Sequence, residues 1–158
     1  MHSLDASSIV YGWDNYRIDK FPKVWEWLES EIWVGNLVIS VTALDEVGHV
    51  SPDCRIWLAA VPITTHTITP HMLSKALAAK AGLDITGDNY HADGVDENDL
   101  LIIACADVTG TQLISNEAVQ NIPPQNKSKY KIPAVCKHVL KVPCISFLEY
   151  INSSPNPF

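Results

Sequence analysis

The chain has 158 residues, the size of one domain, and its 47% hydrophobic and 18% charged residues exclude a disordered or fibrous protein. Its formal net charge of −7 argues against nucleic-acid binding through overall positive charge. Its longest wholly apolar runs, such as 100–106, are far too short to cross a membrane. Because the first residues lack the basic start and long apolar stretch of a signal peptide, the sequence predicts a cytoplasmic protein.

Short segments rich in β-branched residues alternate with helical patterns along the chain. Strands are predicted at 37–41, 112–115 and 142–145, with a weaker one at 3–5. Helices are predicted at 21–33, 42–50, 69–81, 96–108, 133–140 and 147–152. This alternation predicts an α/β fold, in which helices cover both faces of a central, mainly parallel sheet in three α/β/α layers. We expect one domain over 1–151 and a flexible C-terminal tail at 152–158.

Four carboxylates fall where the predicted strands and helices meet: Asp5, Glu46, Asp99 and Glu117. Because the ends of neighbouring parallel strands meet at one edge of a sheet, we expect these side chains to converge. Two carboxylates 4 Å apart repel by about 4 kcal/mol at an effective dielectric near 20, so protons or divalent cations must neutralise them. Mg²⁺ and Mn²⁺ prefer oxygen donors, and with phosphate they support metal-assisted hydrolysis. The sequence therefore predicts nuclease chemistry at this edge.

These residues carry a resemblance to the PIN-domain ribonucleases. The similar motifs, in chain order, are Asp-Ala-Ser at 5–7, Leu-Asp-Glu-Val at 44–47, the apolar run that starts at Asp99 and ends at 106, and an acidic residue after Leu-Ile-Ser-Asn at 113–116. The first 28 residues also resemble an uncharacterised PIN-like subgroup, through the segments at 11–16, 21–22 and 25–28. Two departures are Glu117, where the family more often has Asp, and the long segment 51–95, whose role we do not assign.

The resemblance spans nearly the whole chain, and it implies a PIN-like α/β/α domain that hydrolyses RNA phosphodiester bonds as an endoribonuclease. It implies that Asp5, Glu46, Asp99 and Glu117 are catalytic and hold one or two Mg²⁺ or Mn²⁺ ions. It also implies the toxin component of a bacterial type II toxin–antitoxin system, silenced by a cognate antitoxin protein and able to form a homodimer.

Three further polar residues are expected near the metal. Asp96 lies three positions before Asp99 on the same helix face, so we interpret it as an auxiliary ligand, although it is also a good helix N-cap. Ser7 and Asn116 are expected to orient a ligand carboxylate or a metal-bound water, or else to satisfy backbone groups at strand ends. The acids have simpler alternatives too: Asp5 as a helix cap, and the two glutamates as solvated surface residues.

Aromatic and basic side chains supply candidate RNA contacts. Trp13 and Tyr16, in an expected polar turn near Asp5, are predicted to contact substrate, whereas at least two of the three tryptophans of 21–33 are expected to pack in the core. Five of the eleven basic residues fall within 127–141, which contains no acidic residue. Of these, Lys127, Lys129 and Lys131 are predicted to reach over the site and hold RNA phosphates. The alternatives are a solvated face or a surface that grips an acidic partner.

The sequence also bears on functions other than a nuclease. A PIN scaffold with little catalysis, using its acidic pocket to contact RNA or a protein, is the alternative from another class. The seven glycines form no phosphate-binding loop, which argues against a nucleotide-cofactor enzyme. The four cysteines are not spaced for zinc, and we expect reduced thiols.

Overall fold

The computed structural model describes residues 1–155 and 157–158, so residue 156 of the predicted tail lies outside the described residues. In chain order its elements are β1 (His2–Leu4), α1 (Ala6–Asn15), α2 (Pro22–Trp33), β2 (Leu37–Ser40), α3 (Val41–Val50), α4 (Pro52–Ala60), β3 (Thr64–His66), α5 (Pro70–Gly82), α6 (Glu97–Thr109), β4 (Gln112–Ile114), η1 (Lys127–Lys129), α7 (Ile132–Val135), η2 (Cys136–Leu140), β5 (Cys144–Ile145) and α8 (Phe147–Asn152).

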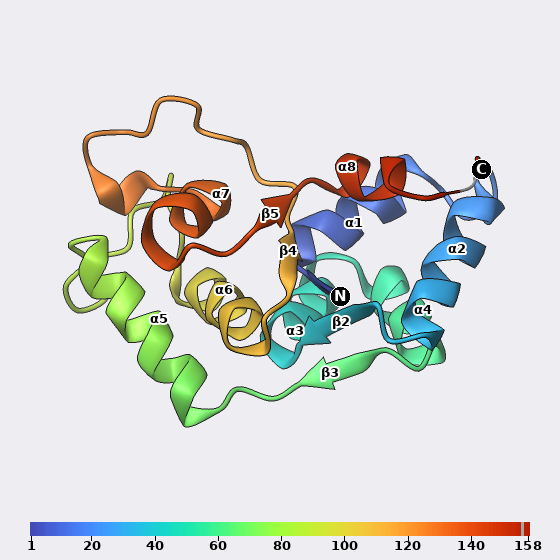
Figure 1. Cartoon of the computed structure of the whole chain (residues 1–158), viewed down its shortest axis with the longest axis horizontal. Helices are drawn as coiled ribbons and strands as arrows, with labels where there is room; N and C mark the ends of the chain where they lie inside the picture. The colour runs from blue at the N-terminus through green and yellow to red at the C-terminus, as the bar shows by residue number, and fades with distance from the viewer. Residues whose placement is uncertain (156) are drawn as a thin grey trace.

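The five strands form one wholly parallel sheet in the order β3-β2-β1-β4-β5. The central strand β1 places Leu4 beside Ile39 of β2 and beside Ile114 of β4. Figure 1 shows α5, α6 and α7 on one side of the strands and α1, α2 and α8 on the other. The predicted three-layer α/β/α fold with a parallel sheet is therefore confirmed.

Helix α6 lies in the interior, as its apolar sequence predicts. It packs against α5, α3 and β4, and it buries Leu100 and the whole run 102–106. A helix whose surface is apolar on every side must be buried by other elements on every side. Its start is fixed by a capping box between Asp96 and Asp99, and it ends at Gly110, whose φ of +66° favours glycine.

Besides the short helix η1, three elements of the structure were missed by the sequence patterns. One is α1, so the expected polar turn around Trp13 is wrong: Trp13 lies inside a helix, and Tyr16 is the residue that ends it. The others are α4 and the edge strand β3, whose residues are mostly exposed and so lack the apolar signature of a buried strand. The strand predicted at 142–145 is shorter, because Pro143 cannot donate to the ladder.

The remaining expectations concern thiols and membranes. All four cysteines are free, as expected. Among the described residues, no helix combines the length and the apolar character that a membrane span requires. The boundary between domain and tail at residue 151 stays a prediction.

Candidate active site

Asp5 stands directly after β1, between that strand and the first turn of α1. It is 2% exposed, and its side chain makes no capping hydrogen bond to α1. Instead its Oδ2 accepts hydrogen bonds from the hydroxyls of Ser7 and Ser115, the latter at 2.9 Å. Ser115 follows β4, the neighbour of β1. The alternative that the Asp5 side chain caps the helix is therefore not what the structure shows.

Asp99 is the third residue of α6 and takes part in the capping box. Its amide donates to Oδ1 of Asp96 at 3.0 Å, and its Oδ2 accepts from the amide of Asp96 at 2.9 Å. A carboxylate near a helix N-terminus is favoured by the helix dipole. The box fixes both the start of α6 and the position of the Asp99 carboxylate.

The two glutamates reach the site from α3 and from the segment after β4. Glu46 lies in the middle of α3, whose start is capped by Ser40 through a 3.1 Å bond from the amide of Ala43. Glu117 lies two residues beyond Ser115, and its Oε2 accepts a 2.9 Å bond from the amide of Ile132, the first residue of α7. Glu117 is thus tied to a distant backbone group rather than left on the loop surface.

All four predicted acids line one pocket of about 430 Å³. Its lining is completed by five further residues: Ala6, Ser7, Val10, His49 and Val50. The acids come from four parts of the chain, and three of those parts directly follow strands β1, β2 and β4. The pocket lies at the carboxyl edge of the sheet, where open α/β sheets place their ligands.

The pKa values of Asp5, Glu46 and Asp99 are raised in this pocket. Burial raises the pKa of Asp99 to about 8, and the negative charges of Asp96, Glu117 and Asp5 act in the same direction. Burial also raises the pKa of Asp5, with Glu117 adding to it and the two serine hydroxyls opposing it. The pKa of Glu46 is raised mainly by burial and then by the same like charges. Carboxylates with raised pKa values that line one pocket are a feature of functional sites.

Two of the auxiliary residues lie near the pocket, and the third caps a helix. Ser7 lines the pocket; its Oγ donates to Asp5 and accepts from the amide of Asn116 at 3.0 Å. Asn116 acts through its backbone there, because its own Oδ1 accepts from the amide of Phe147 at 3.3 Å. Asp96 is outside the pocket lining and serves as the N-cap of α6.

The structure does not bring the predicted aromatic contacts to the pocket. The ring of Trp13 packs against Trp25 at 5.1 Å and against Trp57 at 6.4 Å between ring centroids. Tyr16 packs against Phe21 and Phe147, at 5.7 and 6.1 Å. Trp13 also borders a separate groove of about 400 Å³, with the charged residues of 14–19 and with residue 53. Aromatic packing therefore decides the placement of both rings.

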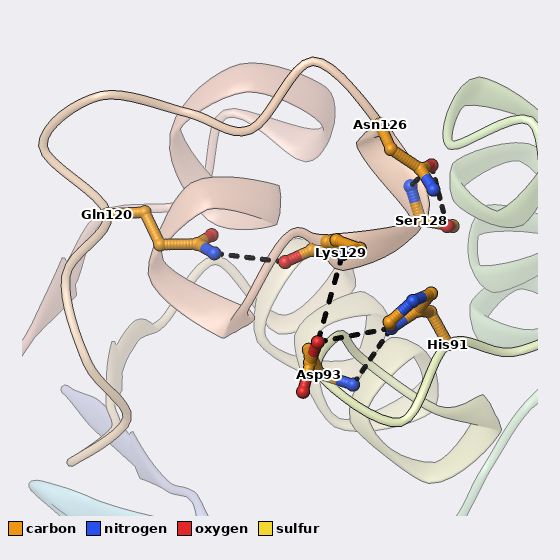
Figure 2. Close-up of polar contacts among 6 residues, drawn as sticks. All are labelled: His91, Asp93, Gln120, Asn126, Ser128 and Lys129. Atoms are coloured by element: carbon orange, nitrogen blue, oxygen red, sulfur yellow. Dashed lines mark hydrogen bonds and ion pairs between the residues drawn. The ribbon is translucent and has the colours of Figure 1, made fainter.

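The three predicted lysines also lie away from the pocket lining. Figure 2 shows Lys129 facing Asp93, which in turn lies beside His91; the Lys129 Nζ to Asp93 Oδ2 distance is 3.9 Å. Lys127 faces Asp84 at 3.7 Å. The third, Lys131, is held through its backbone, since its amide donates to the side chain of Gln120 at 2.9 Å. The contacts of Lys127 and Lys129 join their segment to the acidic loop 84–95, and all three lysines lie outside the pocket lining.

A comparison with protein families assigns the chain. One family model matches residues 2–158, and its description is a domain of unknown function. The chain belongs to this family, DUF4411. No curated protein matches the DUF4411 chain.

A solved structure supports the fold of this DUF4411 chain. The crystal structure of VapBC2 from Rickettsia felis, bound to a DNA fragment from their promoter, is similar with a TM-score of 0.55. The match covers 92% of this chain and 97% of the other at 16% sequence identity. At this identity the likeness shows the fold, which is the PIN-like α/β fold that the motifs imply.

Sequence reasoning missed several residues of the pocket. Ser115 is not among the predicted site residues, yet its hydroxyl donates a hydrogen bond to Asp5. Val10, His49 and Val50 were not singled out, although they line the pocket. The last two follow Glu46 at i+3 and i+4, the spacing that places helical residues on one face, so the helical period contained that signal.

The donors of the DUF4411 pocket suit a hard cation in kind but are spread apart in space. All four are carboxylates, the ligands that Mg²⁺ and Mn²⁺ take. Among residues 1–155 and 157–158, no three His, Cys, Asp or Glu side chains are close enough together to hold a metal ion. Coordination therefore requires side chains to turn inward. Oδ2 of Asp99 and Oε2 of Glu117, which accept backbone hydrogen bonds, would be reoriented.

Proposed function

We propose that this DUF4411 chain is a Mg²⁺- or Mn²⁺-dependent endoribonuclease that hydrolyses RNA phosphodiester bonds. One observation carries the proposal: carboxylates from four parts of the chain line a single pocket at the carboxyl edge of a parallel sheet. Uncompensated negative charges in a shared, half-buried site are costly, and divalent cations remove that cost. The PIN-like fold adds support by analogy.

The side chains have distinct parts in this proposal. Asp5, Glu46, Asp99 and Glu117 would hold one or two ions, with Asp96 as an auxiliary ligand if it leaves its capping position. When bound, the metal lowers the pKa of water and stabilises charge on the leaving oxygen. Ser7 and Ser115 restrict the rotation of the Asp5 carboxylate through their hydroxyls. No side-chain nucleophile is needed.

We also propose that the chain is the toxin component of a type II toxin–antitoxin pair. The fold neighbour is described as VapBC2 bound to a fragment of its promoter, and the two chains match over nearly their full lengths. A cognate antitoxin and a homodimer are the partners that this proposal adds. Growth arrest on expression, relieved by the protein encoded in the adjacent reading frame, would support it; expression without effect on growth would count against it.

Cleavage and Mn²⁺ binding, measured on matched variants, test the enzymatic proposal. Asp5→Asn and Asp99→Asn are expected to abolish metal-dependent cleavage of single-stranded RNA and to weaken Mn²⁺ binding in calorimetric titration. Asp45→Asn is the control, because Asp45 is an exposed neighbour of Glu46 in α3 and lies outside the pocket lining. Undiminished cleavage by either of the first two variants would refute the assignment.

A second candidate is a catalytically weak PIN scaffold that binds RNA or a protein. The spacing of the acids, no three of which are in metal-binding reach among the described residues, favours it, as does the engagement of Glu117 with Ile132. The same titration separates the two functions. A wild-type chain that binds RNA or its partner but takes up no Mn²⁺ would support the scaffold.

A further inference from the structure

Three larger side chains that line the acidic pocket are not carboxylates. Val10, His49 and Val50 line the pocket together with the four acids, and we call these three residues the base wall. We propose that the base wall seats a nucleobase of the RNA substrate, beside the phosphate that the acids handle. This inference rests on the proposed nuclease function and assigns it a nucleotide-binding subsite.

Two packed helices build the base wall. Helix α1 places Ser7 and Val10 in the pocket, and helix α3 places Glu46, His49 and Val50 there. Within each helix these residues are three or four positions apart, so they share one face. Each helix thus carries a polar residue of the acidic end and, about one turn or 5.4 Å further along, a residue of the base wall. The pocket therefore has an acidic end and an end without carboxylates.

The base wall is open to a ligand. Val50 is 70% exposed and His49 is also exposed, so the fold itself does not cover them. Among the residues that line the pocket, His49 has the only ring. The tryptophan ring of Trp13, by contrast, is used in packing against Trp25. If a base stacks in this pocket, His49 provides the flat surface and the valines provide apolar contact.

The charges of the pocket orient a nucleotide in one direction. A phosphate is repelled by the acids unless a cation lies between them, whereas an uncharged base is not. Base faces stack on flat or apolar side chains without requiring a particular base. A nucleotide therefore fits with its phosphate toward the acids and a cation, and its base toward His49 and Val50.

The experiment compares two small probes in the presence of Mn²⁺. Adenosine 5′-monophosphate carries a base and ribose 5-phosphate does not, so the ratio of their affinities in calorimetric titration isolates the contribution of the base. We expect the wild-type chain to bind the nucleotide about tenfold more tightly. His49→Ala should reduce this ratio to about one, and His49→Phe should preserve it because a ring is retained. His71→Ala, at an exposed histidine of α5, is the control.

Val50 offers a second test with a closely matched control. Val50→Ser should lower the ratio severalfold, whereas Val34→Ser, at a valine that is 69% exposed and outside the pocket, should leave it unchanged. Thermal melting verifies that each variant is folded.

The outcomes separate this inference from the nuclease proposal. Equal affinity of the wild type for the two probes would overturn the base wall and leave the acidic site intact. If His49→Ala lowered the affinity for both probes to the same degree, the base wall would also be overturned, because His49 would then contact the phosphate. Failure of the wild type to bind either probe with Mn²⁺ would overturn both proposals.

Discussion

Ser115 donates a 2.9 Å hydrogen bond from its Oγ to Oδ2 of Asp5, across 110 positions of sequence. The two residues come directly after β4 and β1, which are neighbours in the sheet. Parallel pairing brings the ends of these strands together, so the sheet itself aligns hydroxyl and carboxylate. The bond fixes a buried acid that would otherwise lack one of its two side-chain donors.

The first prediction concerns this bond. Ser115→Ala removes a donor from a buried carboxylate, and we expect the free energy of unfolding to fall by about 1–3 kcal/mol. Urea denaturation measures this change in the free energy of unfolding. Ser74→Ala, at an exposed position of α5, is the control and should change stability by less than about 0.5 kcal/mol. Equal stabilities for the two variants would contradict a structural role of the bond.

The second prediction concerns pH. The pKa of Asp99 is about 8 in the folded chain against an ordinary value of 3.8. Between these values the unfolded chain has released a proton that the folded chain retains, so a rise in pH favours unfolding. Without metal, Asp99→Asn should therefore gain stability relative to the wild type between pH 5 and pH 8, by about 1–3 kcal/mol for a partly exposed group.

Urea denaturation in the presence of a chelator at the two pH values measures this difference. Asparagine retains the side-chain oxygen that accepts from the amide of Asp96, so the capping contribution should be the same at both pH values. A stability difference between variant and wild type that does not change with pH would rule out the raised pKa.

The third prediction concerns the contact between α1 and α8. A Cβ added at Gly12 would lie 2.4 Å from Cζ of Phe147, whose side chain is fully buried. Gly12→Ala should therefore destabilise the chain by about 1–3 kcal/mol through overpacking, and Phe147→Leu should partly restore it. Gly48→Ala is the matched helical control, because its Cβ would meet only the flexible side chain of Arg55, at 3.6 Å from Cγ and 3.9 Å from Cδ. That control should be neutral or stabilising. Equal effects of the two alanines would contradict the steric argument.

The fourth prediction concerns the docking of 120–131 on the acidic loop. A Cβ at Gly94 would lie 2.0 Å from the carbonyl oxygen of Ser128, a backbone atom that cannot move aside cheaply. The amide of Val95 also donates to the carbonyl of Tyr130 at 2.9 Å. Gly94→Ala should therefore increase hydrogen exchange throughout 120–131. Lys129→Gln, which removes only an exposed ion pair, should not. Equal exchange in both variants would show that the close backbone contact does not hold the segment.

Much of the fold follows from the sequence because its buried strands and helices carry strong periodic patterns. Helix α6 was predicted within a residue or so because it has both an apolar run and capping residues. Helix α1 was missed because its apolar residues are interrupted by polar ones and by Gly12, and its glycine is needed for contact with α8 rather than for a turn. Local patterns do not contain such distant contacts.

The acidic part of the site was predicted because residues that follow parallel strands lie together at the same edge of the sheet. The sequence did not indicate how the aromatic and basic side chains pack, since their packing depends on partners such as Trp57 for Trp13 and Asp93 for Lys129. Exposure or charge alone does not reveal which partner a flexible side chain will find. Whether these residues touch RNA stays a prediction.

The hydrogen bond between Glu117 and Ile132 would compete with metal ligation through the same carboxylate oxygen. In the structure, Oε2 of Glu117 accepts a hydrogen bond from the amide of Ile132. This bond ties the two ends of the long segment between β4 and α7 together. An ion in the pocket that bound the same oxygen would break this hydrogen bond. The segment between β4 and α7 would then be held less firmly. Binding of Mn²⁺ in the pocket would then change a segment outside it. Limited proteolysis should cut within 118–131 faster when Mn²⁺ is added.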